Sequence, residues 1–267
     1  MLADAITNNA ASPPVHFADA SKIAMIELNA VTKSFPVSAT QTSYALRSVT
    51  MKVMAGEYVT ILGKSGSGKS TLLNLVAGLD RPSSGTVRVA GTLLADQSES
   101  ALARWRGRQV GVVFQFFQLL PTLTVLENII LAMELAAAVP VSRRRSLALD
   151  LLARVNLAEH ANKLPSMLSG GQQQRAAIAR ALANDPPIVV ADEPTGNLDT
   201  ETAHDINGLF QQLIMEGKTL FIVTHDTNIA HAAYRVIELK DGLVVSDSAP
   251  QTARQTPPNA AQPSAHL

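Results

Sequence analysis

The chain has 267 residues, of which 46% are apolar and 16% charged, and its 22 basic residues balance its 22 acidic ones. This length allows one large or two small globular domains, and the neutral balance argues against nucleic acid as the main partner. The absence of cysteine excludes disulfides and thiolate metal sites and is compatible with a reducing cytoplasm.

The two ends of the chain differ in composition from the middle. Residues 1–22 and 246–267 are rich in Ala, Asn, Ser, Gln and Pro without periodicity, which predicts a disordered leader and tail around a folded region over 23–245. The leader has no cation before Lys22 and therefore lacks the basic start of a secretion signal. The most apolar segment, Ile129–Val141, is too short to span a bilayer. We therefore expect a cytoplasmic chain that reaches a membrane only through a partner.

A glycine-rich loop lies between the first predicted strand and helix. Tyr58–Leu62 is an apolar run typical of a buried strand, and the loop that follows reads Gly63-Lys64-Ser65-Gly66-Ser67-Gly68-Lys69-Ser70-Thr71. The next apolar residues have the i, i+3, i+4, i+7 spacing of a helix: Leu72, Leu75, Val76 and Leu79. This arrangement is typical of a phosphate-binding loop, because glycines let backbone N–H groups and the positive helix end approach phosphate oxygens.

The loop predicts a nucleoside triphosphate as ligand. Lys69 is expected to contact the β- and γ-phosphates, and the Ser70 hydroxyl is expected to ligate Mg²⁺. The other loop residues expected at the nucleotide are Gly63, Ser65, Gly66, Ser67, Gly68 and Thr71. On its own, the loop is compatible with a kinase, a GTPase or any other NTPase.

Residues 116–184 are predicted to form a helical subdomain inserted into the core, because they contain helical patterns without convincing strands. Thr124 and Glu127 have the spacing of a capping box. The apolar face that follows consists of Leu126, Ile129, Ile130 and Met133. Two further helices are expected over 143–155 and 172–184.

Two more apolar runs, Ile188–Ala191 and Leu220–Val223, are predicted as buried parallel strands with a helix between them, which indicates an α/β fold. Asp192 ends the first strand and is expected to hold Mg²⁺, while Glu193 is expected to polarise the water that attacks the γ-phosphate. His225 ends the second strand. Its position is compatible with a hydrogen bond to the γ-phosphate and also with a purely structural role.

The order of these motifs over residues 25–245 resembles that of the ABC-type ATPases. The residues that carry the resemblance are Leu168-Ser169-Gly170-Gly171-Gln172 as the signature motif, Gln115 as the Q-loop glutamine, Asp192 and Glu193 as the Walker B pair, Asp199 in the D-loop, and His225 as the switch histidine. Phe35, with Tyr44 as a competitor, matches the aromatic residue that stacks on adenine.

The resemblance implies an α/β fold with a P-loop NTPase (ABC ATPase) core, an inserted helical subdomain and an N-terminal antiparallel β region. It implies ATP and Mg²⁺ as cofactors, with Glu193, His225 and Gln115 as catalytic residues and Ser70, Gln115 and Asp192 as metal ligands. It also implies a head-to-tail homodimer, in which Ser169, Gly170 and Gly171 contact the γ-phosphate bound to the other subunit. Gln172 and Asp199 are also expected at the nucleotide.

Within the family, the motifs look most like the MacB/LolD-type branch, whose members serve macrolide export or lipoprotein release. A transport role requires an integral-membrane permease on a separate chain and a peripheral location on the inner face of the membrane. Phe116, Phe117, Leu119 and Leu120 would line either the groove for that permease or the interior of the subdomain. The alternative is an FtsE-like ATPase that signals through a membrane partner. Lys64 stands where the family frequently has proline.

Overall fold

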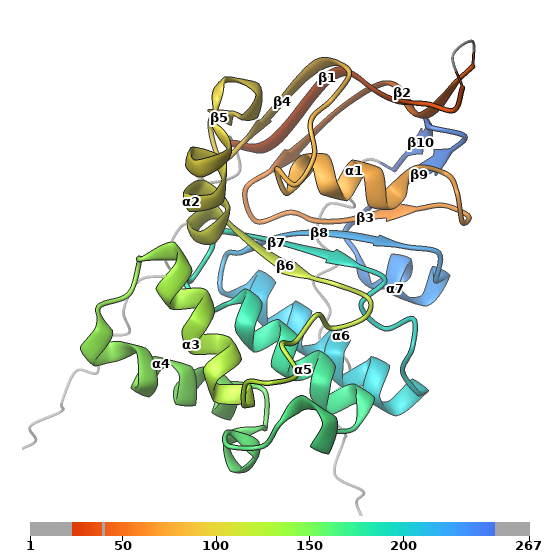
Figure 1. Cartoon of the computed structure of the whole chain (residues 1–267). Helices are drawn as coiled ribbons and strands as arrows, with labels where there is room; N and C mark the ends of the chain where they lie inside the picture. The colour runs from red at the N-terminus through yellow and green to blue at the C-terminus, as the bar shows by residue number, and fades with distance from the viewer. Residues whose placement is uncertain (1–22, 39–40, 249–267) are drawn as a thin grey trace, which may run out of the picture.

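Two β-sheets and a layer of helices build the protein, as the computed structural model of residues 23–38 and 41–248 shows (Figure 1). The predicted leader, and the predicted tail beyond Ser248, lie outside these described residues. The larger sheet has the order β10-β9-β3-β8-β7-β6. Its strands are β3 (Tyr58–Leu62), β6 (Val110–Val113), β7 (Ile188–Asp192), β8 (Thr219–Thr224), β9 (Arg235–Lys240) and β10 (Leu243–Asp247).

All neighbours in this sheet are parallel except the pair formed by β9 and β10. The strands predicted from apolar runs are confirmed as β3, β7 and β8, and their side chains are buried on both faces. Phe221 and Val223 pack toward the smaller sheet, whereas Leu220 and Ile222 pack against helices on the other side. This alternation follows from the two-residue period of a strand, and it explains why the sequence shows no polar face.

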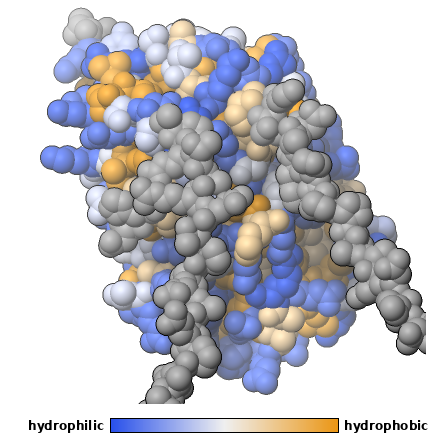
Figure 2. Space-filling model, turned by 180° about the vertical axis from the view of Figure 1, so that it is seen from behind, coloured by the Kyte–Doolittle hydropathy of each residue, from blue (hydrophilic) through white to orange (hydrophobic). Residues whose placement is uncertain are grey.

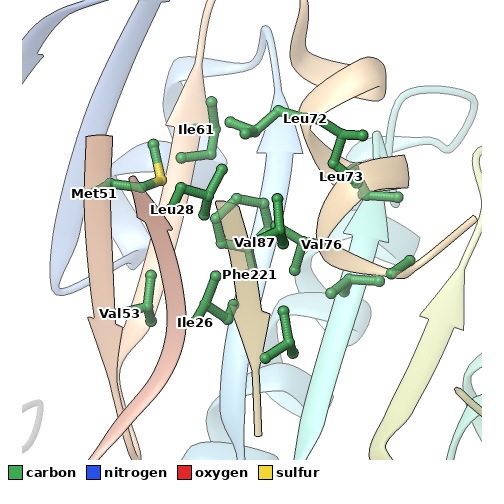
Figure 3. Close-up of a cluster of buried hydrophobic side chains, with 14 of the residues drawn as sticks. Ile26, Leu28, Met51, Val53, Ile61, Leu72, Leu73, Val76, Val87 and Phe221 are labelled. Atoms are coloured by element: carbon green, nitrogen blue, oxygen red, sulfur yellow. The ribbon is translucent and has the colours of Figure 1, made fainter. Parts of the chain in front are cut away.

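The smaller sheet is the N-terminal antiparallel region that the resemblance implied. It has the order β2-β1-β4-β5 and consists of β1 (Ala24–Pro36), β2 (Thr42–Met54), β4 (Ser84–Val89) and β5 (Thr92–Leu93). Helix α1 (Lys69–Val76) lies between the two sheets (Figure 1). Ile26, Leu28 and Val87 of the smaller sheet meet Leu72 of α1 and Phe221 of β8 in one buried cluster (Figure 3).

Side chains of α5, α6 and α7 pack against the opposite face of the larger sheet. The helices after α1 are α2 (Glu99–Gln109), α3 (Val125–Ala136), α4 (Val141–Arg154), α5 (Gly170–Ala181), α6 (Thr200–Met215) and α7 (Thr227–Ala232), with 3-10 turns at Leu94–Asp96, Ala158–His160 and Pro165–Met167. Between β6 and β7 the chain forms only α3, α4, α5 and two of these turns. None of the helices in the described ranges has the length and apolar character to cross a bilayer.

Local chemistry explains where these helices begin and end. The predicted capping box begins α3: the Thr124 hydroxyl accepts from the Glu127 N–H, and the Glu127 carboxylate accepts from the Thr124 N–H at 2.7 Å. Helix α1 ends at Val76, before Gly78 with φ of +64°, so the predicted face residue Leu79 lies past the helix and is 45% exposed.

The surface mixes polar and apolar residues. Figure 2 shows the back of the molecule, where the coloured residues form small apolar patches among hydrophilic ones. This pattern is ordinary for protein surface in contact with water.

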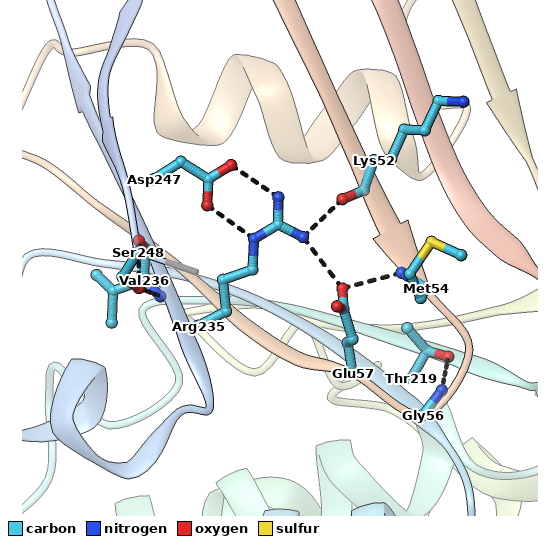
Figure 4. A network of polar contacts seen from close by, with 9 residues as sticks. All are labelled: Lys52, Met54, Gly56, Glu57, Thr219, Arg235, Val236, Asp247 and Ser248. Atoms are coloured by element: carbon cyan, nitrogen blue, oxygen red, sulfur yellow. Dashed lines mark hydrogen bonds and ion pairs between the residues drawn. The ribbon is translucent and has the colours of Figure 1, made fainter. Parts of the chain in front are cut away.

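An ionic network around Arg235 in β9 connects the two sheets (Figure 4). It includes the last residue of β10, Asp247, which lies two residues past the predicted end of the folded region. The Arg235 guanidinium donates two hydrogen bonds of 2.7 Å to Asp247 in β10. It also donates to the Lys52 carbonyl in β2 at 2.8 Å and to Glu57 at 3.2 Å. These contacts raise the pKa of Arg235 above its usual value, chiefly through the hydrogen bonds to Asp247.

We expect Arg235→Ala to lower the free energy of unfolding by about 2–4 kcal/mol, because it leaves the largely buried Glu57 carboxylate without its cation and removes the link between β2 and β10. Urea denaturation followed by circular dichroism measures this loss. The matched control is Arg154→Ala, which removes a pair with Glu216 in which both side chains are more than 40% exposed. That pair should contribute less than about 1 kcal/mol. Equal losses in the two variants would contradict the structural role of the network.

Candidate functional site

A cleft of about 650 Å³ lies at the carboxyl ends of β3, β7 and β8, where ligands bind in open α/β sheets. Its lining comes from the glycine loop, from the ends of β7 and β8, and from Gln115 after β6. The lining residues are Ala45, Lys64, Ser65, Gly66, Gly68, Lys69, Ser70, Thr71, Gln115, Asp192, Glu193 and His225. Lys64 and His225, which lie 161 positions apart in the sequence, therefore meet because β3 and β8 are parallel neighbours.

Two glycines of the loop are required by its shape. A Cβ at Gly68, where φ is +104°, would lie 2.3 Å from the Ala45 carbonyl oxygen. A Cβ at Gly63 would lie 2.4 Å from the Leu239 carbonyl oxygen and 2.5 Å from Ser67 Oγ. Both contacts are far inside van der Waals distance. The loop therefore packs directly against β2 and β9, and Ser67 is buried beneath it instead of lining the cleft.

The loop ends in the first residue of α1. Gly68 is the N-cap of this helix and provides no side-chain hydrogen bond to the N–H groups of its first turn. The first turn contains no acidic residue either. Free N–H groups and the positive end of the helix dipole at Lys69 and Ser70 suit an anion such as phosphate.

Lys69 is 93% buried, since only 7% of it is exposed. Its ammonium group donates to the carbonyl oxygens of Gly63 at 2.8 Å and Lys64 at 3.1 Å. It also lies 3.7 Å from Glu193 Oε1. The ammonium group is thus held by carbonyls of its own loop and lies close to Glu193, the residue that follows β7.

Glu193 follows directly after β7 and has a backbone φ of +44°, which is unusual for a residue with a side chain. Its side chain is turned toward β8. The carboxylate accepts from the Thr224 hydroxyl at 2.8 Å and from the His225 N–H at 3.2 Å, and it lies 2.9 Å from the His225 ring nitrogen Nδ1. The imidazole itself is 63% exposed toward the cleft side. Glu193 is therefore buried but still at the cleft.

Asp192 and Ser70 both line the cleft and offer oxygen ligands that suit a cation. Burial raises the pKa of Asp192, and the hydrogen bond from Ser70 opposes this rise. Asp192 Oδ1 is buried without a hydrogen-bond partner among the described residues. A hydroxyl beside a carboxylate oxygen with free acceptor capacity fits Mg²⁺, which takes few protein ligands and keeps waters and substrate phosphates for the remaining positions. In the part of the chain that the structure describes, no cluster of three or more His, Asp or Glu forms a metal cage.

Gln115 connects the cleft to the helical subdomain. Its amide group lies near Gly196, where an added Cβ would be 3.6 Å from Nε2, and its carbonyl oxygen lies 3.5 Å from the Asn197 amide. The backbone that follows has positive φ at Phe117 and Gln118. The carbonyls of these two residues accept from the Arg180 guanidinium of α5.

The signature residues do not line the cleft of their own chain. Ser169 is the N-cap of α5 and forms a capping box with Gln172, with hydrogen bonds of 3.0 and 3.3 Å. Ser169 and Gly170 are exposed, whereas a Cβ at Gly171 would lie 2.3 Å from the Thr202 methyl group. The structure therefore separates these residues from the glycine loop of the same chain. The signature motif was predicted at the nucleotide of another subunit, which this separation does not contradict.

The remaining predicted residues also lie outside the cleft lining. Asp199 is the N-cap of α6 and accepts from the Thr202 N–H, which lowers the pKa of Asp199. Phe35 and Tyr44 are 44% and 46% exposed on the paired strands β1 and β2, and each lies beside a cation. Both rings stay candidates for adenine stacking.

Sequence reasoning missed Thr224 and Ala45. Thr224 contacts Glu193 through its hydroxyl, and Ala45 lines the cleft and has its carbonyl against Gly68. Neither position carries a chemical signal in the sequence, because a threonine at a strand end and an alanine in a strand are common structural residues.

Comparison with known proteins agrees with this geometry. The family described as ABC transporter matches residues 46–196. An uncharacterized ABC transporter ATP-binding protein of Thermotoga maritima is 48% identical over 75% of this chain and 85% of its own length. The macrolide export ATP-binding/permease protein MacB of Photorhabdus laumondii is 44% identical over 88% of this chain but only 36% of its own length.

A solved structure extends the similarity to three dimensions. The dimeric, post-hydrolysis structure of the ATP-binding cassette MJ0796 with ADP and Pi superposes with a TM-score of 0.80. It is 43% identical and covers 85% of this chain and 99% of that one. The site and the fold define an α/β ATPase of the P-loop class. The chain belongs to the ABC transporter family, as one of its ATP-hydrolysing cassettes.

Proposed function

We propose that the chain is the ATP-binding and hydrolysing subunit of an exporter of MacB/LolD type and drives a separate permease through head-to-tail dimerisation. One observation carries the proposal. The glycine loop lies in a cleft to which the exposed N-terminus of α5 contributes no residue. A second copy of the chain can supply that helix end, since Ser169 and Gly170 present a hydroxyl and bare amides that suit an anion.

The predicted site residues then have roles in nucleotide binding and hydrolysis. Lys69 and the N–H groups of the loop bind the β- and γ-phosphates, and Phe35 or Tyr44 stacks on adenine. Glu193 accepts a hydrogen bond from the attacking water, while Gln115 and His225 orient the water and the γ-phosphate. Water oxygen bonds to the γ-phosphorus as the water gives one proton to the Glu193 carboxylate. The bond between the γ-phosphorus and the β-phosphate oxygen breaks, its electron pair stays on ADP, and ADP and phosphate leave.

Ser70 and Asp192 are the protein groups that would hold Mg²⁺, with Gln115 as a further ligand. When bound, the ion neutralises charge that develops on the phosphate oxygens. The free acceptor capacity of Asp192 Oδ1 supports this assignment.

The partner in this proposal is an integral-membrane permease, which would keep the chain at the inner face of the membrane. The MacB relative is named an ATP-binding/permease protein, and this chain matches about a third of it. A groove of about 510 Å³ beside the Gln115 segment is available for docking, lined among others by Leu79, Leu135 and Phe114. Of the predicted apolar segment, Phe116 is 68% exposed, whereas Leu119 packs against the helical subdomain. Two relatives are named as macrolide and pyoverdine export proteins, which favours this function over FtsE-like signalling.

The shared site can be tested by crosslinking, because the chain has no cysteine of its own. We expect a mixture of Ser65→Cys protein and Ser169→Cys protein to form covalent dimers with a short bismaleimide in the presence of ATP and Mg²⁺. Ser65 and Ser169 are both exposed, so the reagent can reach them. Denaturing gels measure the product.

Each single-cysteine protein alone is the matched control and should give little dimer, because a head-to-tail pair does not place identical residues together. The proposal fails if the mixture gives no more dimer than the separate proteins, or if adding Lys69→Ala to both leaves the yield unchanged.

A further inference from the structure

Thr224 is a fully buried threonine at the last position of β8, directly before His225. Its hydroxyl oxygen lies 2.8 Å from Glu193 Oε2 and 3.0 Å from the backbone nitrogen of Asp226. The direction of both hydrogen bonds is determined, because an ionised carboxylate only accepts and a backbone N–H only donates. The hydroxyl therefore gives its single proton to Glu193.

Parallel pairing of β7 and β8 produces this contact. Asp192 pairs with Val223, so the next residues along the two strands are Glu193 and Thr224. The Glu193 N–H donates to the Val223 carbonyl at 2.9 Å, and the positive φ of Glu193 turns its side chain across to β8. The threonine is thus placed by the register of the sheet rather than by the loop.

The two carboxylate oxygens of Glu193 have different surroundings. Oε2 accepts from the Thr224 hydroxyl and the His225 N–H, which are both fixed parts of the end of β8. Oε1 contacts the Lys69 ammonium and the His225 ring, and both of these side chains line the cleft. One oxygen is therefore tied to the sheet, and the other lies on the side of the nucleotide loop.

We propose that Thr224 is a positioning residue for ATP hydrolysis, which holds Glu193 Oε2 so that Oε1 is presented to the attacking water. The inference rests on the proposed role of Glu193 toward that water. Thr224 itself touches neither water nor nucleotide. Its hydroxyl acts by restricting the carboxylate to one orientation, which is the geometric requirement for a general base.

The test compares two substitutions that separate the shape of Thr224 from its hydroxyl. Thr224→Val keeps the branched shape and removes the hydroxyl, and it should lower kcat for ATP about 10- to 100-fold, with the KM for ATP changed less than about threefold. Thr224→Ser keeps the hydroxyl and should recover most of the lost kcat. If the valine variant does not fold, Thr224→Ala provides the same comparison with serine.

Thr219→Val is the matched control on the same strand. Thr219 is also buried at 1% exposure, and its hydroxyl accepts from the Gly56 N–H at 3.0 Å far from the cleft (Figure 4). Both valine substitutions therefore remove the acceptor of one backbone N–H. The control should lower the unfolding temperature while kcat stays within about twofold of the wild-type value.

A double substitution tests whether Thr224 acts through Glu193. In a Glu193→Gln background, Thr224→Val should cause little further loss of kcat, because two residues that act as a unit are not additive. The inference is overturned if Thr224→Val retains wild-type kcat, if serine does not recover activity, or if the two losses multiply. Undiminished turnover by Glu193→Gln alone would instead overturn the proposed function.

Discussion

Replacement of Glu193 by glutamine is expected to lower ATP turnover by about 10²- to 10⁴-fold while ATP still binds. Glutamine has the shape of the native side chain but cannot act as an anionic acceptor for the attacking water. Lys69, Ser70 and the loop amides, which would bind the phosphates, remain in place. Since hydrolysis is what would separate the two subunits, ATP-bound dimers should accumulate.

Phosphate release measures the turnover, and size-exclusion chromatography with light scattering measures the dimer in ATP and Mg²⁺. The matched control is Glu216→Gln, which removes a carboxylate from an exposed ion pair with Arg154 and should change neither quantity. A variant that binds ATP at saturation yet stays monomeric would contradict the shared site. Normal turnover would remove Glu193 from its proposed role.

Removal of the Lys69 side chain has the second large expected effect, on binding rather than on turnover of bound ATP. Lys69→Ala should weaken ATP binding about 10- to 100-fold, as expected for the loss of a charge-assisted hydrogen bond to phosphate. In the structure the buried Lys69 ammonium donates to the carbonyls of Gly63 and Lys64, so it lies within the loop that would hold the phosphates. Isothermal titration with ATP and with ADP measures the change.

Lys69→Met separates charge from packing, because methionine keeps much of the apolar stem without the ammonium group. It should lose ATP affinity as alanine does and retain the wild-type unfolding temperature more closely. Lys218→Ala, which removes an ion pair with Asp185 at the amino ends of β7 and β8, should bind ATP normally. Unchanged ATP affinity in both Lys69 variants would exclude the loop as the phosphate site.

Strands differed in how well the sequence predicted them. β3, β7 and β8 are buried on both faces and therefore stand out as continuous apolar runs. The strands of the smaller sheet were expected only through the family resemblance. β1 and β2 are amphipathic, and their pairing contains several register shifts, which interrupt the two-residue pattern. β6 has only four residues and directly follows α2, so its pattern is too short to detect.

By itself, the sequence determined the chemistry available at the site. It contains a loop that can surround phosphate, two carboxylates and a histidine at the ends of strands, and a helix that begins with two glycines after the N-cap Ser169. Tertiary structure decided which of these groups meet. Parallel pairing of β3 with β8 and of β8 with β7 aligns their carboxyl ends, and so brings Lys69, Glu193 and His225 together. It also places Thr224 beside Glu193 and leaves Ser169 outside the cleft, because these relations depend on strand register and helix position, which no local pattern encodes.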